Sequence, residues 1–269
     1  MNDLLHLDRS PLFVIAGPCV IESAELCLAV GSHVKQVCEK LGITYIFKAS
    51  FDKANRSSSA SFRGPGLQEG LVILDRVKRE LDLAVLTDVH EAEQAPVAAE
   101  VVDVLQVPAF LARQTDLLVA CGKTGRAVNI KKGQFMSPQE MGTALNKVTS
   151  AGNVRVMLTE RGTFFGYNRL VNDFTAIAVM KGMNVPVVFD ITHSTQQPAG
   201  LGDKSGGNRQ YSPLLARAAV AAGVDGLFLE CHPDPKNAKS DAATMLDLND
   251  VEPLLTQCKQ VAELRRSWK

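Results

Sequence analysis

Eight short apolar runs recur along the chain, and nearly every one ends in a residue that can take part in chemistry. Their length and their content of Val, Ile and Phe are typical of buried strands. The runs are 13–19, 44–48, 84–90, 102–108, 126–132, 154–161, 185–193 and 226–232. Their carboxyl ends carry Cys19, Lys48, Asp88 with His90, Gln106, Lys131, Glu160 with Arg161, Asp190 with His193, and Glu230 with His232. If the strands close into a parallel ring, all of these side chains surround one mouth.

Helical segments separate the runs, which favours parallel strands covered by helices. Apolar residues recur at helical spacing in 26–41, before Gly42, and in 67–81. Residues 137–140 (SPQE) have the form of a capping box, and Ser212-Pro213 opens a helix that ends at Gly223. Eight units average roughly 33 residues each, as one barrel requires. We therefore predict an α/β protein with a single (β/α)8 TIM barrel over residues 1–269. The alternative, a doubly wound open sheet, lacks its usual glycine-rich turn after the first strand.

Composition excludes several classes of function. Lys plus Arg equals Asp plus Glu, at 29 each, so no overall charge attracts nucleic acid or an anionic membrane. No apolar run is long enough to span a membrane, and the first residues lack the order of a secretion signal. The six cysteines lack the spacing of a disulfide framework, and five of them read as reduced, buried thiols. We expect a cytoplasmic protein.

Two long connections, 48–66 and 193–212, follow the second and seventh runs and should emerge on the catalytic side of the barrel. Gly200, Gly202, Gly206 and Gly207 predict that the second is a mobile lid. It is not a P-loop, because no Gly-Lys-Ser/Thr stands in the required frame.

A mixed set of sulfur, nitrogen and oxygen donors follows the first, seventh and eighth runs. Cys19, His193 and Glu230, with Asp241 as a further candidate, should converge because these strands are consecutive around a closed barrel. Such a set suits Zn²⁺, Fe²⁺ or Mn²⁺ better than Ca²⁺ or Mg²⁺. The same residues could instead be hydrogen-bonding partners in a polar pocket. His232 shares the strand face of Glu230 and could substitute as a ligand, whereas Cys231 points away.

Basic residues gather near the same mouth and predict an anion site: Lys48, Lys53, Arg56, Lys131 and Arg161. Guanidinium and ammonium groups suit phosphate and carboxylate oxygens. Each could instead lie on a solvated rim, and an inward Lys48 or Lys131 could form a Schiff base. Lys131 and Lys132 alternate, so only one can face inward. Asp88 could contact substrate hydroxyls or cap the following helix.

Eight stretches together resemble the 3-deoxy-D-manno-octulosonate 8-phosphate (Kdo8P) synthase family. They are AGPCVIES (16–23), FKASFDKANRSS (47–58), LTDVHE (86–91), QVPAFLARQTDL (106–117), VNIKKGQF (128–135), TERGTFFGY (159–167), FDITHSTQ (189–196) and LFLECHPDP (227–235). The related heptulosonate-phosphate (DAHP) synthases share the AGPC-type start, but their second-strand loop reads like KPRTS where this chain has KANRSS at 53–58. A barrel that binds phosphosugars without catalysis is the remaining alternative.

The resemblance implies condensation of phosphoenolpyruvate with D-arabinose 5-phosphate in a homotetramer. It places phosphoenolpyruvate on Lys48, Ser50, Lys53, Gln106, Ala109, Lys131 and Arg161, with Pro108 also in the pocket. It places the pentose phosphate on Asn55, Arg56, Ser57, Asp88 and an Arg113 from a neighbouring subunit. The catalytic residues it implies are Cys19, Lys131, His193 and Asp241.

The resemblance also implies a metal ion. The metal-dependent class of the family has Cys where the other class has Asn, and Cys19 matches the former. The stretch KSDAATML (239–246) supplies Asp241 in the form of that class. The implied ligands of a divalent ion of the Zn²⁺, Fe²⁺ or Mn²⁺ type are Cys19, His193, Glu230 and Asp241.

Overall fold

The computed structural model describes residues 12–55, 61–198, 200 and 206–268. Eight parallel strands form its central sheet: β1 (Phe13–Gly17), β2 (Thr44–Lys48), β3 (Ala84–Asp88), β4 (Val104–Val107), β5 (Ala127–Lys131), β6 (Val156–Glu160), β9 (Val187–Asp190) and β12 (Gly226–His232). Strand β1 pairs with both β2 and β12, which closes the sheet. All eight predicted strands are present, and the (β/α)8 barrel is confirmed.

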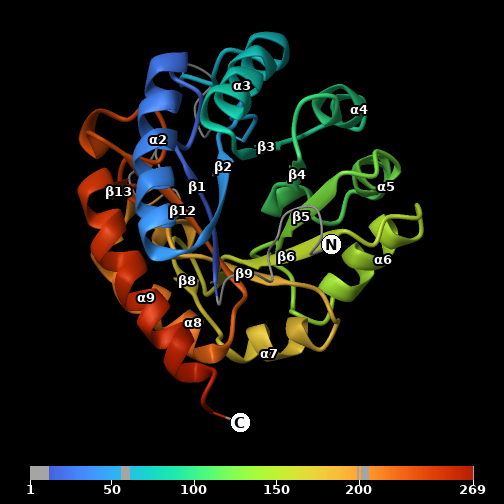
Figure 1. The fold of residues 1–269 in the computed structure, drawn as a ribbon. Coiled ribbons are helices and arrows are strands. Elements are labelled where there is room, and N and C mark those ends of the chain that lie inside the picture. Colours follow the sequence, from blue (N-terminus) through green and yellow to red (C-terminus); the bar gives the residue numbers. More distant parts are fainter. Residues whose placement is uncertain (1–11, 56–60, 199, 201–205, 269) are drawn as a thin grey trace.

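Helices lie outside the barrel, as Figure 1 shows. They are α2 (Ala24–Leu41), α3 (Leu67–Leu81), α4 (Gln94–Ala99), α5 (Thr115–Lys123), α6 (Met141–Thr149), α7 (Thr175–Lys181), α8 (Ser212–Ala222) and α9 (Val251–Arg265). The predicted signals operate: Gly42 and Gly223 end α2 and α8 in the left-handed conformation. Ser137 and Glu140 form the reciprocal bonds of the capping box, one turn before α6 begins. In the described part of the chain, no helix is both long and apolar enough to cross a membrane.

Alternation along the strands separates two apolar layers. Of two successive strand residues, one packs inside the barrel. The inward residues form a cluster of Phe13, Ile15, Ile46, Leu86, Val104, Ala127, Met157, Val188 and Phe228. The other packs against the helices in a larger cluster. Because side chains two positions apart share a face, the interior residues are followed by polar residues on the same side, namely Lys48, Asp88, Gln106, Asn129, Asp190 and Glu230. This places a polar layer directly above the apolar interior.

Short elements decorate the carboxyl ends of the strands. Strands β7 (Thr163–Phe164) and β8 (Leu170–Val171) pair as a hairpin after β6. In the second long connection, β10 (Gln196–Gln197) pairs with β11 (Gly206–Gly207), so its base is a two-stranded ribbon. The predicted lid falls partly on residues 199 and 201–205, outside the described residues. Strand β13 (Leu246–Asp247) extends the sheet beside β12.

Candidate active site

A cavity of about 660 Å³ opens at the carboxyl ends of the barrel strands. Of the residues proposed from the sequence, it is lined by Lys48, Lys53, Asn55, Asp88, Gln106, Pro108, Ala109, Lys131, Arg161, His193, Glu230 and Asp241. Cys19 and Ser50 are buried close by: Cys19 contacts Asp241, and Ser50 contacts Asp88. The barrel therefore brings nearly the whole predicted set to one place. Arg56 and Ser57 lie outside the described residues, and Arg113 is exposed and does not line the cavity.

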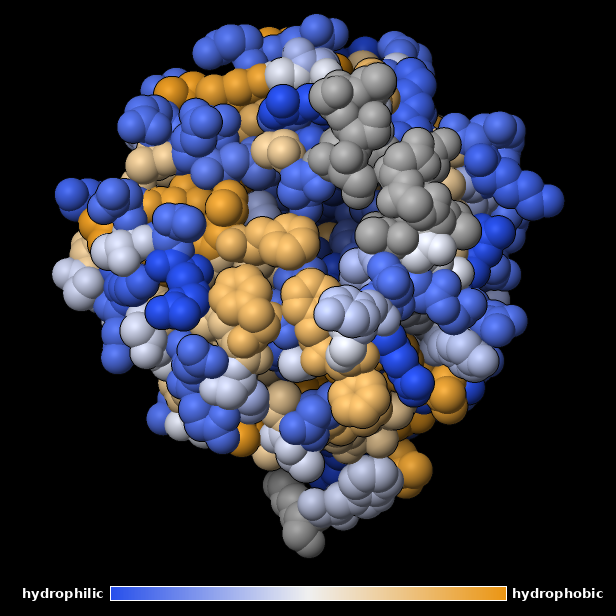
Figure 2. Space-filling model, turned by 180° about the vertical axis from the view of Figure 1, so that it is seen from behind, coloured by the Kyte–Doolittle hydropathy of each residue, from blue (hydrophilic) through white to orange (hydrophobic). Residues whose placement is uncertain are grey.

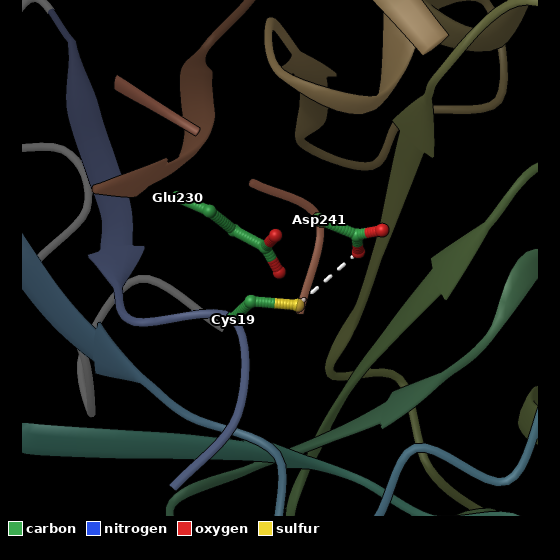
Figure 3. Close-up of side chains that lie close together, drawn as sticks. All are labelled: Cys19, Glu230 and Asp241. Atoms are coloured by element: carbon green, nitrogen blue, oxygen red, sulfur yellow. Dashed lines mark hydrogen bonds between the residues drawn. The ribbon is translucent and has the colours of Figure 1, made fainter. Parts of the chain in front are cut away.

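The predicted metal-ligand set converges at one end of this cavity. One ligand atom from each of Cys19, Glu230 and Asp241 lies within 4.8 Å of the others, and Figure 3 shows these side chains pointing toward one another. His193 Nε2 lies 3.6 Å from Glu230 Oε2 and 3.6 Å from Asp241 Oδ2. Strand β12 and the segments that follow β1, β9 and β12 supply the four side chains. His232, the alternative ligand, instead lies 3.6 Å from Glu22.

The chemistry of this cluster fits a divalent cation. Glu230 Oε2 is buried and has no hydrogen-bond partner among the described residues, although two carboxylates and an imidazole nitrogen share the space. The Cys19 thiol donates to Asp241 Oδ2 at 3.2 Å, and burial together with Asp241 and Glu230 raises its pKa well above the ordinary value. A thiol, an imidazole and two carboxylates are the donors that zinc and related ions prefer. A cation between them would satisfy the unpartnered oxygen and replace the thiol proton.

Asp190 connects this cluster to the cationic side of the cavity. Its Oδ2 lies 2.8 Å from His193 Nδ1 and accepts a hydrogen bond from Lys131 Nζ at 2.7 Å. The carboxylate therefore orients the imidazole so that Nε2 faces Glu230 and Asp241. Burial alone would raise the pKa of Asp190, but His193 and Lys131 hold it well below its usual range. Sequence analysis placed Asp190 at a strand end but assigned it no role; its position three residues before His193 was the available signal.

The cations predicted to bind anions form one wall of the cavity. Lys48 and Lys131 are 1% and 6% exposed, so the solvated-rim alternative is wrong for both. Lys48 Nζ donates to Glu230 Oε1 at 2.6 Å, and Lys53 Nζ lies 3.8 Å from the same oxygen. Arg161 Nη2 donates to Gln196 Oε1 at 2.6 Å, whereas its Nη1 is buried and finds no partner in the part of the chain that the structure describes. A charged donor left unpaired in a cavity is suited to an anionic ligand.

Strand alternation sends neighbouring lysines to opposite sides, as predicted. Lys131 Nζ lies 3.6 Å from the centre of the Phe228 ring inside the barrel. Lys132 is buried outside it, 3.5 Å from Glu160 and 2.9 Å from Thr163 Oγ1. Lys132 therefore ties together the segments that follow β5 and β6.

A buried chain of hydrogen bonds orients Asp88. Ser50 Oγ and Gln106 Nε2 donate to its two carboxylate oxygens. Gln106 Oε1 in turn accepts from Asn129 Nδ2 at 2.8 Å, and Asn129 Oδ1 accepts from Thr159 Oγ1 at 2.6 Å. Asp88 makes no cap to α4, so the capping alternative is wrong and the carboxylate faces the cavity.

Gly17 allows the first strand to approach the second. A Cβ at this position would lie 2.0 Å from the carbonyl oxygen of Lys48. The close approach brings the segment after β1 to the end of β2, where Lys48 Nζ donates to the carbonyl oxygen of Cys19 at 2.8 Å. This contact gives the glycine of the AGPC stretch a physical reason.

Further lining residues were not proposed as site residues from the sequence. His90, Gln134 and Gln196 reach the cavity from the ends of strands or from β10, and Lys236 and Lys239 come from the segment after β12. His90 follows a strand, which was a usable signal. The two lysines lie in an irregular segment, so no strand periodicity could place them.

Comparison with known proteins shows similarity over nearly the whole chain. The family model described as the DAHP synthetase I family matches residues 3–267. A 2-dehydro-3-deoxyphosphooctonate aldolase of Protochlamydia amoebophila (strain UWE25) is 51% identical over 256 residues, 95% of this chain and 93% of its own. Proteins of the same name from Synechococcus sp. and Acidithiobacillus ferrooxidans are 53% and 54% identical, over 95% and 92% of this chain and 90% and 88% of their own lengths.

Proposed function

The chain belongs to the DAHP synthetase I family, and we propose that it is a transferase of the 3-deoxy-8-phosphooctulonate synthase type. It condenses phosphoenolpyruvate with D-arabinose 5-phosphate and water, giving 3-deoxy-D-manno-octulosonate 8-phosphate and inorganic phosphate. The name shared by relatives over nearly their whole length supports the choice of substrates. One observation carries the proposal: a wall of buried cations and a cluster of metal-ligand type share a single cavity.

Phosphoenolpyruvate is assigned to the cationic wall. Lys53, Lys131 and Arg161 bind its phosphate and carboxylate, and the unpartnered Arg161 Nη1 supports this assignment. Lys48, Ser50, Gln106 and Ala109 complete the pocket or hold its members in place. Arg161 offers a planar fork that matches either anionic group, and the ammonium groups neutralise the remaining charge.

The pentose phosphate is assigned to the outer part of the same cavity. Asn55 lines it. The family resemblance adds Arg56 and Ser57 to the phosphate site, and both lie outside the described residues. Asp88 is oriented toward the cavity by two donors and accepts hydrogen bonds from the sugar hydroxyls. With the two substrates assigned in this way, the aldehyde of the sugar is proposed to lie between phosphoenolpyruvate and the predicted metal ligands Cys19, His193, Glu230 and Asp241.

The reaction proceeds by positioning and charge neutralisation. Carbon C3 of phosphoenolpyruvate attacks the aldehyde carbon, and the effective concentration of the held groups lowers the barrier by several kcal/mol, up to about 7–11 kcal/mol in the best-oriented cases. Water adds to C2, and phosphate leaves from the tetrahedral centre with its C–O bond broken. Lys131, His193 and Asp190 form a hydrogen-bonded group that can hold or pass a proton beside the new alkoxide. A divalent ion bound by Cys19, His193, Glu230 and Asp241 would polarise the aldehyde or orient water.

A homotetramer is part of this proposal. Phe110, Phe135, Phe164 and Phe165 are between 41% and 64% exposed, and they belong to segments that follow β4, β5 and β6. Hydrophobic side chains gather near the middle of the face seen in Figure 2. An apolar patch beside the cavity supports contact between subunits, through which a neighbour's Arg113 would reach the pentose phosphate. Sedimentation equilibrium tests the tetramer, and a monomeric active enzyme would contradict it.

A cytoplasmic location also belongs to the proposal. All six cysteines are free and buried, which supports a reducing compartment.

A single coupled assay tests the reaction. We expect phosphate release from phosphoenolpyruvate only when arabinose 5-phosphate is present. Release with erythrose 4-phosphate instead would identify a DAHP synthase, and binding of arabinose 5-phosphate without release would identify a sensor. Covalent trapping by borohydride would identify a Schiff-base aldolase. In the structure, Lys48 Nζ lies 2.6 Å from Glu230 Oε1 and Lys131 Nζ lies 2.7 Å from Asp190 Oδ2.

Chelation followed by metal add-back tests the ion. We expect activity to fall with the chelator and to return with Zn²⁺, Fe²⁺ or Mn²⁺. A Cys19→Ala variant with full, chelator-resistant activity would remove the metal from the proposal.

A further inference from the structure

The four predicted metal ligands, Cys19, His193, Glu230 and Asp241, form what we call the ligand cluster. Of these, Asp241 lies farthest along the chain from a barrel strand. Cys19 follows β1, His193 follows β9, and Glu230 lies within β12. Asp241 instead lies in the irregular segment between β12 and β13, and its backbone adopts a left-handed conformation with φ 48°. This conformation is uncommon for residues other than glycine, although aspartate adopts it more readily than most. The position of Asp241 therefore depends on the contacts that its segment makes with other segments.

Glu22, in the segment between β1 and α2, makes one such contact. Its Oε1 accepts a hydrogen bond from the backbone N–H of Lys239 at 2.9 Å, although the two residues are 217 positions apart. Lys239 precedes Asp241 by two residues, and Glu22 follows Cys19 by three. Between them, Ser240 Oγ and Cys19 Sγ lie within hydrogen-bond distance of each other, at 3.1 Å. Glu22, which is not itself a predicted ligand, therefore ties the segment that carries Cys19 to the segment that carries Asp241.

His232 completes this contact. Its Nδ1 accepts a hydrogen bond from the backbone N–H of Asp234 at 2.9 Å, so in the neutral ring the proton is on Nε2. That nitrogen is buried, has no hydrogen-bond partner within residues 12–55, 61–198, 200 and 206–268, and lies 3.6 Å from Glu22 Oε1. The His232 imidazole thus holds the start of the irregular segment at Asp234. Its other ring nitrogen directs an N–H toward the Glu22 carboxylate, which holds the same segment at Lys239.

We propose that Glu22 and His232 form a latch that positions Asp241 for metal binding. The latch, defined by these two residues, rests on the metal site of the proposed function. Both residues are positioning residues, because neither reaches the ligand cluster itself. Partners that hydrogen-bond metal ligands directly change metal affinity by about 10–100-fold when removed. Glu22 acts through the backbone of Lys239, two residues from Asp241, so we expect the lower end of that range.

Competition between Zn²⁺ and a chromogenic chelator tests the latch on the whole protein. We expect Glu22→Ala to weaken Zn²⁺ binding by about tenfold or more. Glu22→Gln keeps an oxygen that can accept from the Lys239 N–H, so it should restore most of the affinity. Glu25→Ala is the matched control, since Glu25 is 79% exposed and makes only a surface pair with Arg76 at 3.7 Å. Thermal unfolding without metal should be similar for the variants, which separates positioning from folding.

The outcomes distinguish the latch from the site it serves. If Glu22→Ala binds Zn²⁺ as tightly as the unsubstituted protein, the latch is refuted while the metal site stands. If Glu22→Ala and Glu25→Ala weaken binding equally, a general charge effect replaces the latch. If the unsubstituted protein binds no Zn²⁺, the metal site is refuted and the latch with it. His232→Asn keeps an acceptor for Asp234 but loses the N–H toward Glu22, and we expect it to weaken binding less than Glu22→Ala.

Discussion

Replacing Asp190 by Asn removes one negative charge at the point where the two halves of the site meet. Asp190 is fully buried and its Oδ2 contacts both Lys131 Nζ and His193 Nδ1. Its Oδ1 accepts from the backbone N–H groups of Thr192 and His193, at 3.2 and 2.9 Å. An Asn has one oxygen for these two sides. If that oxygen keeps the backbone bonds, its NH₂ group faces the ammonium and the imidazole N–H.

The magnitude follows from the buried charge left behind. Removing one partner of a buried pair costs about 3–5 kcal/mol, because the remaining charge is desolvated without compensation. We expect Asp190→Asn to lower the free energy of unfolding by this amount at neutral pH, measured by urea denaturation. Because Asp190 also orients a metal-ligand imidazole, Zn²⁺ affinity should fall about 10–100-fold.

The effect should depend on pH in a defined direction. His193 and Lys131 hold the pKa of Asp190 below its value in the unfolded chain, despite the opposing effect of burial. The carboxylate therefore stabilises the fold above its unfolded pKa of about 3.9, and this contribution is lost as the pH falls further. The difference in stability between Asp190→Asn and the unsubstituted protein should shrink with acid, from about pH 4 downward.

Asp225→Asn is the matched control. Asp225 precedes β12 at the other end of the barrel, where it pairs with Lys181 at 2.6 Å and is 31% exposed. A partly exposed pair of this kind contributes about 1 kcal/mol or less. The reasoning fails if Asp190→Asn loses no more stability than Asp225→Asn, or if its Zn²⁺ affinity is unchanged.

Three further predictions rest on single contacts. Zn²⁺ binding should release at least one proton, because burial keeps the Cys19 thiol protonated without an ion; calorimetry in buffers of different ionisation enthalpy would contradict this if the heats were equal. Gly17→Ala should unfold at lower denaturant than Gly142→Ala, since its Cβ would lie 2.0 Å from Lys48 O while that of Gly142 finds nothing nearer than 3.7 Å. Lys132→Met should lower the free energy of unfolding by about 3–5 kcal/mol, because it removes the buried cation beside Glu160. The KM for phosphoenolpyruvate should stay unchanged, because Lys132 points away from the cavity. A raised KM would show that Lys132 acts on the site.

The strands could be predicted from the sequence because they are buried on both faces. A continuous apolar run such as that of β12 leaves few alternatives, and the polar residue at its end then falls at the barrel mouth. The same reasoning predicts from the sequence alone that Cys19, Lys131 and Glu230 lie in one site. It also separated Lys131 from Lys132, since alternation permits only one inward lysine.

Segments without a period were beyond this reasoning. Hairpin β7–β8 and the β10–β11 ribbon are each built from strands of two residues, too short to show alternation. The contact between Glu22 and Lys239 joins residues 217 positions apart in two irregular segments, and no local pattern announces it. From the residues alone Asp241 was only a further candidate ligand, because it lies in neither a strand nor a helix, and the family resemblance then supported it.

The charges of the site explain why its two halves must be considered together. Three lysines of the cavity each contact a carboxylate near or within the ligand cluster: Lys48 and Lys53 contact Glu230, and Lys131 contacts Asp190. A cation placed among the ligands would compete with these lysines for the negative charge of Glu230. The lysines are then less neutralised and attract an anion more strongly, so binding on one side favours binding on the other. By thermodynamic reciprocity, an anion on the lysines must favour the cation to the same extent.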